Sequence, residues 1–435
     1  MAASDLQGDV VTGVDEPSAS GDAVGTRPAS AELAQAESGA VLAVTGFPPK
    51  LDHPNGFSAR ANRLLTAVAR RWPLDVVAVH AGDADWTADT FLPDGFPVRR
   101  FACETPGPNP LNAAGPAGAA RRAMHYLAGR LPYGSHPRRL RTLDARLRAE
   151  RPALGLFFLP HTEHLSLALP PGVPAICVVE EGFERAMDWT VQDAGPLRRL
   201  LIAGEHARIA SLHRRVAARG GRFVVISDTE ADWLARSVPP GRITVIPHGV
   251  DCGYFAPMDA PAEHDVAVFG QLGEPRVYEP AVELYARMRD AGLRWAFVGR
   301  NPALEVAALA SPQVTVTGMV PDVRPFYARS RVALVPTRIG TGVKTTVLQA
   351  WAMGRPVVAT PFALTGLPAR PGENVLVGET ADELAAHVAG LLASPDLAGR
   401  VGDAGLRTVR EERDTRLLAE RFADLCAEAM ESQRG

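Results

Sequence analysis

The sequence has few cysteines and no long apolar run. These two features argue against a membrane-spanning protein and against a fold held by disulfides or zinc. No apolar stretch approaches the ~18 residues of a membrane-spanning helix, and the N-terminus lacks the basic patch and apolar core of a signal peptide. The wide spacing of the cysteines, with no CxxC pair, argues against a zinc cluster or a disulfide framework. They are Cys103, Cys177, Cys252 and Cys426. We therefore expect reduced thiols in a cytoplasmic protein.

The net charge is also small. The 49 acidic and 46 basic residues leave a formal charge of −3, which gives no support for a nucleic-acid partner. The balance is uneven along the chain, because residues 1–39 hold seven acids and Arg27 as their single base. The remainder thus carries about +3, a mild bias that suits an anionic small molecule or a membrane surface.

Lysine is the scarcest charged residue, since only Lys50 and Lys344 occur among the 46 basic residues. This scarcity, with abundant alanine, glycine and proline, is typical of proteins from GC-rich bacterial genomes. The composition is otherwise that of a globular protein, 46% hydrophobic and 22% charged, and 435 residues are enough for two or three domains. Lys344 is a candidate functional residue, because a lysine is retained there although the composition favours arginine.

Short apolar strands alternate with amphipathic helices from residue 40 onward, which is typical of a parallel sheet covered on both faces. Before them, residues 1–39 lack apolar periodicity, and we expect this acidic segment to be disordered. The expected strands of the first series are 41–47, 74–80, 153–158, 174–179, 222–227 and 242–247. The expected helices are 58–71, with Ser58 as its N-cap, 113–130, 137–150, 195–219 and 228–237.

A glycine- and proline-rich stretch without periodicity, 248–264, predicts a linker to a second alternating series. Its expected strands are 265–270, 294–299, 314–318, 331–336 and 356–360, and its expected helices are 278–291, 321–329, 343–353, 381–393 and 397–410. The fold class is therefore α/β, with two Rossmann-like, doubly wound domains at 40–247 and 265–410 that face a central cleft. A last helix, within 411–435, is expected to pack back toward the first domain.

The segment RVALVPTRIGTGVKTTVLQAW (331–351) carries the clearest functional pattern. Gly340 and Gly342 let the backbone approach a ligand closely after the expected strand, and a helix is expected to begin at Val343. Free amides at a helix N-terminus attract anions, and Lys344 on the first turn adds a positive charge. The combination favours a diphosphate site over the plainer alternative of a tight turn beside a surface lysine.

Several motifs, in order along the chain, resemble those of the family 4 nucleotide-sugar-dependent glycosyltransferases of the GT-B fold. They are VVISDTEADWL (224–234), RITVIPHGVDCGYF (242–255), FGQL (269–272), WAFVG (295–299), the segment 316–360 and TPFALTGL (360–367). The resemblance covers 220–400 well and is weaker over 40–220, where a glycine loop at Gly56 and VVEEGFER (178–185) are similar to family motifs.

This resemblance implies transfer of a sugar from a nucleotide-sugar donor to a hydroxyl acceptor, with retention of anomeric configuration. No metal or other cofactor is expected, because Lys344, Arg276 and the helix amides supply positive charge and no DxD-type carboxylate cluster is placed to hold a metal. The resemblance places donor binding at Gly270, Gln271, Gly340, Thr341, Gly342, Thr345 and Gln349, with Gly56 from the first domain. The sequence departs from the family where two glutamates spaced E-x7-E are replaced by Thr341 and Gln349. Gln271 stands where the family has arginine, and Arg276 is the nearest cation.

Four residues are candidates for the chemistry. Lys344 and Arg276 would stabilise charge that develops on a departing diphosphate. His161, after the expected strand 153–158, could orient the acceptor hydroxyl or the leaving phosphate, and Glu181, at the family's histidine position, could act as an acid or base. The alternatives are a histidine bonded to backbone and a solvated acid at a helix start.

Two other functions compete with sugar transfer. A P-loop nucleotide hydrolase needs glycine directly before its lysine, and Val343 in that place argues against it. The main alternative is a non-catalytic homologue that binds a sugar nucleotide or activates a partner, because Gln271 and Gln349 replace charged family residues.

The arginines of 195–219 form either a solvated face or a peripheral contact with the inner face of the membrane. No motif specifies the oligomeric state.

Overall fold

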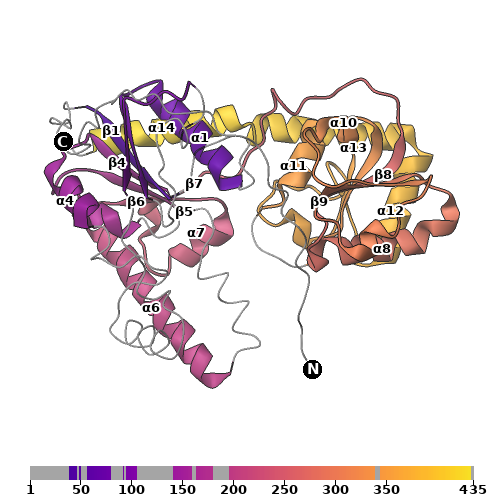
Figure 1. The fold of residues 1–435 in the computed structure, drawn as a ribbon, viewed down its shortest axis with the longest axis horizontal. Coiled ribbons are helices and arrows are strands. Elements are labelled where there is room, and N and C mark those ends of the chain that lie inside the picture. The colour runs from indigo at the N-terminus through magenta and orange to yellow at the C-terminus, as the bar shows by residue number, and fades with distance from the viewer. Residues whose placement is uncertain are drawn as a thin grey trace, which may run out of the picture. The chain divides into compact units, whose positions relative to one another are not determined.

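The computed structural model contains two α/β halves, each built on a parallel sheet (Figure 1). It describes residues 39–46, 49, 56–79, 92, 95–104, 141–158, 163–179, 195–338 and 343–432. The acidic segment 1–39, except Gly39, lies outside these residues, and so does the expected helix 113–130. The two sheets confirm the α/β fold class that the alternating pattern predicts.

The first sheet has seven parallel strands in the order β3-β2-β1-β4-β5-β6-β7. Three of its strands, β1 (Val41–Thr45), β4 (Leu154–Phe158) and β5 (Ala175–Val179), are buried along their whole length, which explains their unbroken apolar sequences. The strand order reverses between β1 and β4, and ligands bind near such a reversal at the carboxyl ends of the strands. The other strands are β2 (Leu74–Val79), β3 (Arg100–Glu104), β6 (Arg222–Val225) and β7 (Ile243–Val245).

The helices of the first half begin and end near their expected positions. They are α1 (Gly56–Ala69), α4 (Arg141–Ala149), α6 (Pro196–Ala218), α7 (Asp228–Leu234) and the 3₁₀ helices η2 (Glu163–Ala168) and η3 (Pro240–Arg242). One expectation is wrong: α1 begins at Gly56, so Ser58 lies buried inside the helix rather than at its N-cap. A true cap occurs at Ser227, whose Oγ accepts a hydrogen bond from the Glu230 N–H of α7 at 3.2 Å.

The second sheet has six parallel strands in the order β10-β9-β8-β11-β12-β13. They are β8 (His264–Gln271), β9 (Trp295–Arg300), β10 (Val314–Val316), β11 (Ser330–Val335), β12 (Val357–Ala359) and β13 (Leu376–Val377). The first of these begins at His264, one residue inside the expected linker. The order reverses between β8 and β11.

The helices of the second half follow the expected alternation, with the short α9 as an addition. They are α8 (Pro275–Met288), η4 (Arg289–Ala291), α9 (Leu304–Ala307), α10 (Arg324–Ala328), α11 (Thr345–Ala352), η5 (Phe362–Leu364), α12 (Ala381–Ala393) and α13 (Pro395–Glu412). The expected helix start at Val343 is wrong by two residues, because α11 begins at Thr345 with Lys344 as its N-cap.

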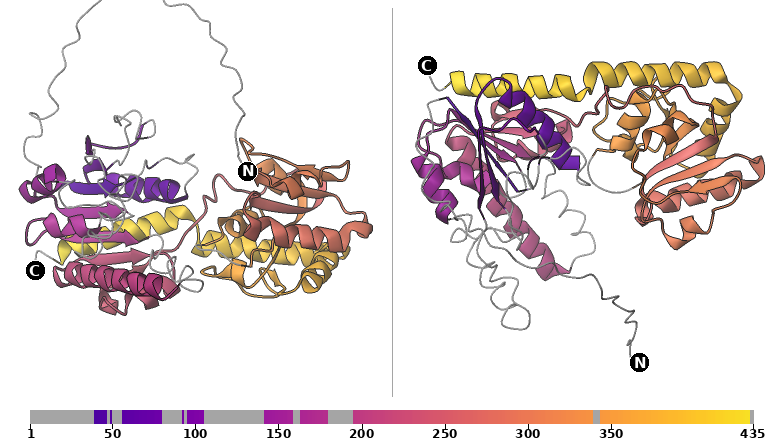
Figure 2. Two further views of the ribbon diagram at one scale, coloured as in Figure 1. Left: turned by 60° about the horizontal axis from the view of Figure 1, so that its bottom comes forward. Right: turned by 45° about the horizontal axis from the view of Figure 1, so that its top comes forward.

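The last helix, α14 (Thr415–Glu431), packs against α1 and the first sheet (Figures 1 and 2). Its Phe422 and Cys426 are fully buried in the same apolar cluster as β1 and β4. The Phe422 ring lies 6.1 Å from the ring of Phe158, measured between centroids. At the surface, Arg71 forms ion pairs with Glu420 and Asp424, both at 2.6 Å. These contacts make α14 part of the first half's core.

Within the described residues, no helix combines the length and the apolar character that crossing a bilayer would require.

Candidate donor site at the carboxyl end of the second sheet

The reversal of strand order between β8 and β11 brings four of the predicted donor residues, Gly270, Gln271, Thr345 and Gln349, to one edge of the second sheet. Gly270 and Gln271 end β8, and β11 is followed by the segment that leads to Lys344 and α11. This is the edge at which doubly wound sheets bind ligands. Three predicted residues of that segment, Gly340, Thr341 and Gly342, lie outside the described residues.

Glycines let the backbone of β8 and β9 come unusually close at this edge. Gly270 has φ +143°, a conformation that side-chain-bearing residues rarely adopt, and it pairs with Gly299 of β9. A Cβ atom at Gly299 would overlap the Gly270 carbonyl oxygen. Just beyond, Asn301 has φ +48°, and a Cβ at Gly273 would overlap its carbonyl oxygen. Strained backbone of this kind concentrates at functional sites.

The N-terminus of α11 presents free amides and one lysine. Lys344 is the N-cap, its side chain makes no cap hydrogen bond, and the exposed Thr345 is the first helical residue. The Lys344 Nζ lies 5.6 Å from the centroid of the Phe362 ring, within range of a cation–π contact. The eight-residue helix thus offers amide donors and a cation at the same end, which is the chemistry that binds phosphate.

Gln349 lies one helical turn further along α11 and is half-buried. Its Oε1 accepts a hydrogen bond from the Tyr327 hydroxyl at 3.2 Å, and that hydroxyl also reaches the Thr346 carbonyl at 3.3 Å. Burial raises the pKa of Tyr327, so its hydroxyl stays a neutral donor. The Tyr327 ring stacks on Phe269 of β8 with centroids 3.7 Å apart. Gln349 is therefore held in place by the core beneath the strand ends.

Arg276, predicted as the cation nearest the diphosphate, forms an ion pair in the structure. It lies exposed in the first turn of α8, and its Nε donates to Glu274 Oε1 at 2.6 Å. This hydrogen bond raises the pKa of Arg276 and lowers the pKa of Glu274. The acid partly cancels the positive charge that Arg276 would offer a phosphate.

The structure gives less information on the predicted residues of the first half. Gly56 is the first residue of α1, which follows β1 at the reversal of the first sheet, so its place suits a ligand loop. His161 and Glu181 both lie outside the described residues. Their predicted roles stay predictions.

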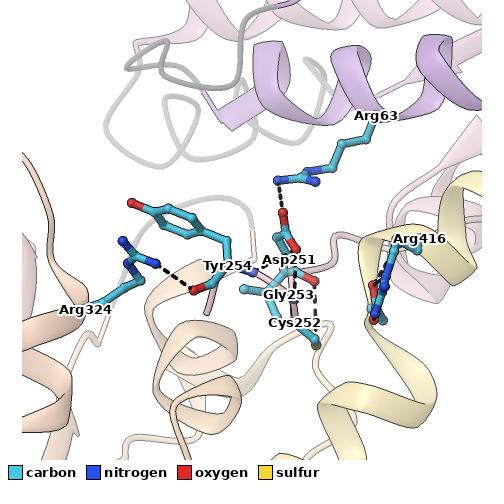
Figure 3. A network of polar contacts seen from close by, with 9 residues as sticks. Arg63, Asp251, Cys252, Gly253, Tyr254, Arg324 and Arg416 are labelled. Carbon is cyan, nitrogen blue, oxygen red and sulfur yellow. Dashed lines mark hydrogen bonds and ion pairs between the residues drawn. The ribbon is translucent and has the colours of Figure 1, made fainter. Parts of the chain in front are cut away.

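The linker after β7 carries a polar network that motif reading missed (Figure 3). Arg63 of α1 forms an ion pair with Asp251 at 2.8 Å, and Asp251 Oδ1 accepts the N–H groups of Gly253 and Tyr254 at 2.9 and 3.0 Å. Burial alone would raise the pKa of Asp251, but the Arg63 charge and these N–H donors lower it. From α10, Arg324 lies over the Tyr254 ring at 3.8 Å and donates to the Tyr254 carbonyl at 3.2 Å.

Two arginines and a histidine with buried or partly buried side chains lie beside this linker. Arg60, 8% exposed, donates to the Ile246 carbonyl at 2.7 Å, and Arg413 at the end of α13 donates to the Gly366 carbonyl at 3.3 Å. Burial lowers the pKa of His248 to about 3, and the charges of Arg60 and Arg413 act in the same direction. His248 is therefore neutral at physiological pH. None of these contacts carries a local sequence signal, because each joins residues far apart in the chain.

Two family profiles match the chain, Glycosyltransferase Family 4 over residues 87–254 and Glycosyl transferases group 1 over residues 263–394. The lipopolysaccharide core biosynthesis mannosyltransferase LpcC of Rhizobium leguminosarum bv. viciae is 27% identical over 240 residues. That alignment spans 49% of this chain and 66% of the relative's length. This chain is a group 1 glycosyltransferase.

Solved structures show that the glycosyltransferase has the GT-B fold. Sucrose-phosphate synthase from Thermosynechococcus elongatus superposes with a TM-score of 0.63 at 16% identity, over 90% of this chain and 99% of its own. Anabaena HepE, solved in complex with UDP-glucose, gives a TM-score of 0.59 at 12% identity, over 90% of this chain and 100% of its own. The fold and family predicted from the motifs are thus confirmed, and nothing in these matches favours the non-catalytic alternative.

Proposed function

We propose that this glycosyltransferase moves a sugar from a nucleoside-diphosphate donor to a hydroxyl acceptor, with retention of anomeric configuration. The observation that carries the proposal is the α11 N-terminus with Lys344, placed beside the strand-order reversal of the second sheet. Anabaena HepE, which shares the fold, was solved with UDP-glucose. The group 1 profile covers the same half of the chain, 263–394.

In this proposal the donor's diphosphate lies at the α11 N-terminus. The bond between the anomeric carbon and the diphosphate oxygen breaks, and its electron pair stays on that oxygen. The Lys344 ammonium and the first amides of α11 stabilise the charge that develops there. The acceptor oxygen bonds to the anomeric carbon, and its proton passes to the departing diphosphate oxygen. Gly270 and Gln271 line the donor from β8, and Thr345 and Gln349 line it from α11.

We further propose that no metal takes part, because the lysine and the helix amides supply the positive field. Among the described residues, no group of three His, Cys, Asp or Glu side chains is arranged to hold a metal ion. Transfer in the presence of excess EDTA tests this: unchanged turnover agrees with the proposal, and a loss restored by Mg²⁺ or Mn²⁺ contradicts it.

The substitution Lys344→Ala tests the donor site. We expect it to weaken binding of the preferred nucleoside diphosphate, found by calorimetry among UDP, GDP and ADP, and to lower transfer by roughly 100-fold or more, the usual effect of removing one charge-stabilising donor. Arg287→Ala is the control, because Arg287 is an exposed cation of α8 that pairs with Asp382. It should leave binding and transfer unchanged.

Two results would contradict the proposal. Folded Lys344→Ala that transfers sugar like the parent would remove the lysine from the mechanism. A parent protein that binds none of the three nucleoside diphosphates would overturn the donor class itself. Binding without transfer from any sugar nucleotide would instead support the non-catalytic alternative.

A further inference from the structure

Arg413 lies where the chain leaves α13 and is tied by its backbone to the linker. The Val250 N–H donates to the Arg413 carbonyl at 2.9 Å, and the Thr415 N–H donates back to the Val250 carbonyl at 3.0 Å. The contact is close, because a Cβ atom at Gly249 would lie 2.5 Å from the Arg413 carbonyl oxygen. A shift of the linker backbone would therefore move the backbone of Arg413.

The Arg413 side chain reaches the loop of residues 361–367, which contacts the donor lysine segment. Its Nη2 donates to the Gly366 carbonyl at 3.3 Å. Gly366 has φ +76°, and a Cβ there would lie 3.2 Å from Val343 Cγ2, so the loop backbone packs directly on the residue before Lys344. The same loop carries Phe362, whose ring lies below the Lys344 ammonium. One loop thus contacts both Val343 and Lys344.

The guanidinium of Arg413 is poorly satisfied for a group so enclosed. Its Nε and Nη1 are buried and have no hydrogen-bond partner among the described residues, and burial lowers the pKa of Arg413. Arg355, also partly buried, differs, because its donors reach the carbonyls of Met353, Ala328 and Ser330. Arg355 therefore serves as a purely structural comparison.

We propose that Arg413 is a positioning residue for Lys344. Its hydrogen bond to Gly366 holds the 361–367 loop against Val343, so that the ammonium stays beside the free amides of α11 and follows the geometry of the linker. The inference rests on the proposed role of Lys344 in holding the donor diphosphate. It assigns to the α13–α14 junction a part in donor binding that no motif in the sequence indicates.

Calorimetric titration with UDP, GDP and ADP tests the proposal in the variants Arg413→Met, Arg413→Lys and Arg355→Met. For the nucleotide that the parent binds, we expect about tenfold weaker binding in Arg413→Met, a free-energy change of ~1.4 kcal/mol, and near-parent binding in Arg413→Lys, which can still donate to Gly366. Arg355→Met should melt at a lower temperature yet bind the nucleotide with the parent Kd. Hydrogen exchange should accelerate at the amides of residues 362–367 in Arg413→Met alone.

The outcomes separate this inference from the proposed function. Parent-like Kd and exchange in folded Arg413→Met would overturn the positioning role, while Lys344→Ala would still test the donor site. Nucleotide binding unaffected by Lys344→Ala would overturn both. If Arg413→Met does not fold, Gly366→Ala replaces it, because strain at φ +76° and the contact with Val343 displace the same loop; a parent-like Kd there also overturns the inference.

Discussion

Burial keeps His213 neutral in the folded protein. Its side chain, on α6, is 2% exposed and meets the Phe223 ring edge-on with centroids 5.3 Å apart. Nδ1 is buried without a hydrogen-bond partner among the described residues, and burial lowers the pKa of His213 to about 4. An unfolded chain would protonate this imidazole near pH 6.5. The folded protein is therefore sensitive to acid at this position.

The sign of the pH effect follows from that difference. Above pH 6.5 the His213 imidazole is neutral in both states, so it adds no pH dependence to the free energy of unfolding. Between pH 6.5 and about 4 the unfolded state binds a proton at His213 and the folded state does not. The free energy of unfolding should fall by roughly 2 kcal/mol between pH 6.5 and 5 from this residue alone. Urea denaturation of the parent and of His213→Leu at pH 7.5 and 5.0 checks this, and an equal loss in both would contradict it.

Lys344 and Arg413 show which site residues a sequence can reveal. Lys344 follows a glycine-rich turn after an apolar strand, so its signal is local and its place at the α11 N-terminus was predictable. Arg413 contacts a carbonyl 47 residues away, and its neighbours along the chain are ordinary helix residues. Such a role depends on the folded backbone and leaves no pattern in the sequence.

Among the elements, strong local signals gave accurate boundaries and weak ones did not. The helix α12 spans 381–393 as predicted, because Thr380 and Glu383 form a capping box at its start. By contrast, β3 and the two-residue β13 were missed, since charged ends shorten the apolar run of the former and the latter is too brief to show periodicity. Three-dimensional pairing with β2 and β12 makes them strands.

The helix α14 should be essential to the first sheet's stability. Replacing the fully buried Phe422 with alanine removes its packing against Phe158 and leaves a cavity, at a cost of about 3–5 kcal/mol in the free energy of unfolding. Leu417 of the same helix is 49% exposed, so Leu417→Ala should cost less than about 0.5 kcal/mol. Chemical denaturation of both variants measures this, and similar losses would show that α14 is held in another way.

On the scale of the whole molecule, the chain passes between the two sheets twice, and the passages are bonded to each other. Val250 of the linker forms a parallel bridge with Asp414 of the α13–α14 junction. Asp251 adds the ion pair to Arg63 and the turn that begins the linker (Figure 3). The linker therefore has an ordered, hydrogen-bonded backbone at its start, although its composition predicts only an irregular connection.

Asp251 variants separate the two contributions of that side chain. Asp251→Asn keeps an oxygen for the N–H groups of Gly253 and Tyr254 but loses the ion pair with Arg63, a loss of about 1 kcal/mol or less. Asp251→Ala loses both and should cost about 1–3 kcal/mol, since two N–H groups lose their acceptor. Melting curves at low and high salt check this ranking. The Asn difference should nearly vanish at high salt, whereas the Ala difference should shrink only by the ion-pair share.

The position of α14 also affects the order in which the protein can fold during translation. A ribosome releases the first sheet long before the helix that completes its apolar cluster, because that helix begins at Thr415. Nascent chains that stop short of this residue leave the α1 side of the cluster uncovered, and such uncovered apolar surfaces attract chaperones or aggregate. The amino-terminal half of this enzyme is thus the first to be synthesised and the last to be finished.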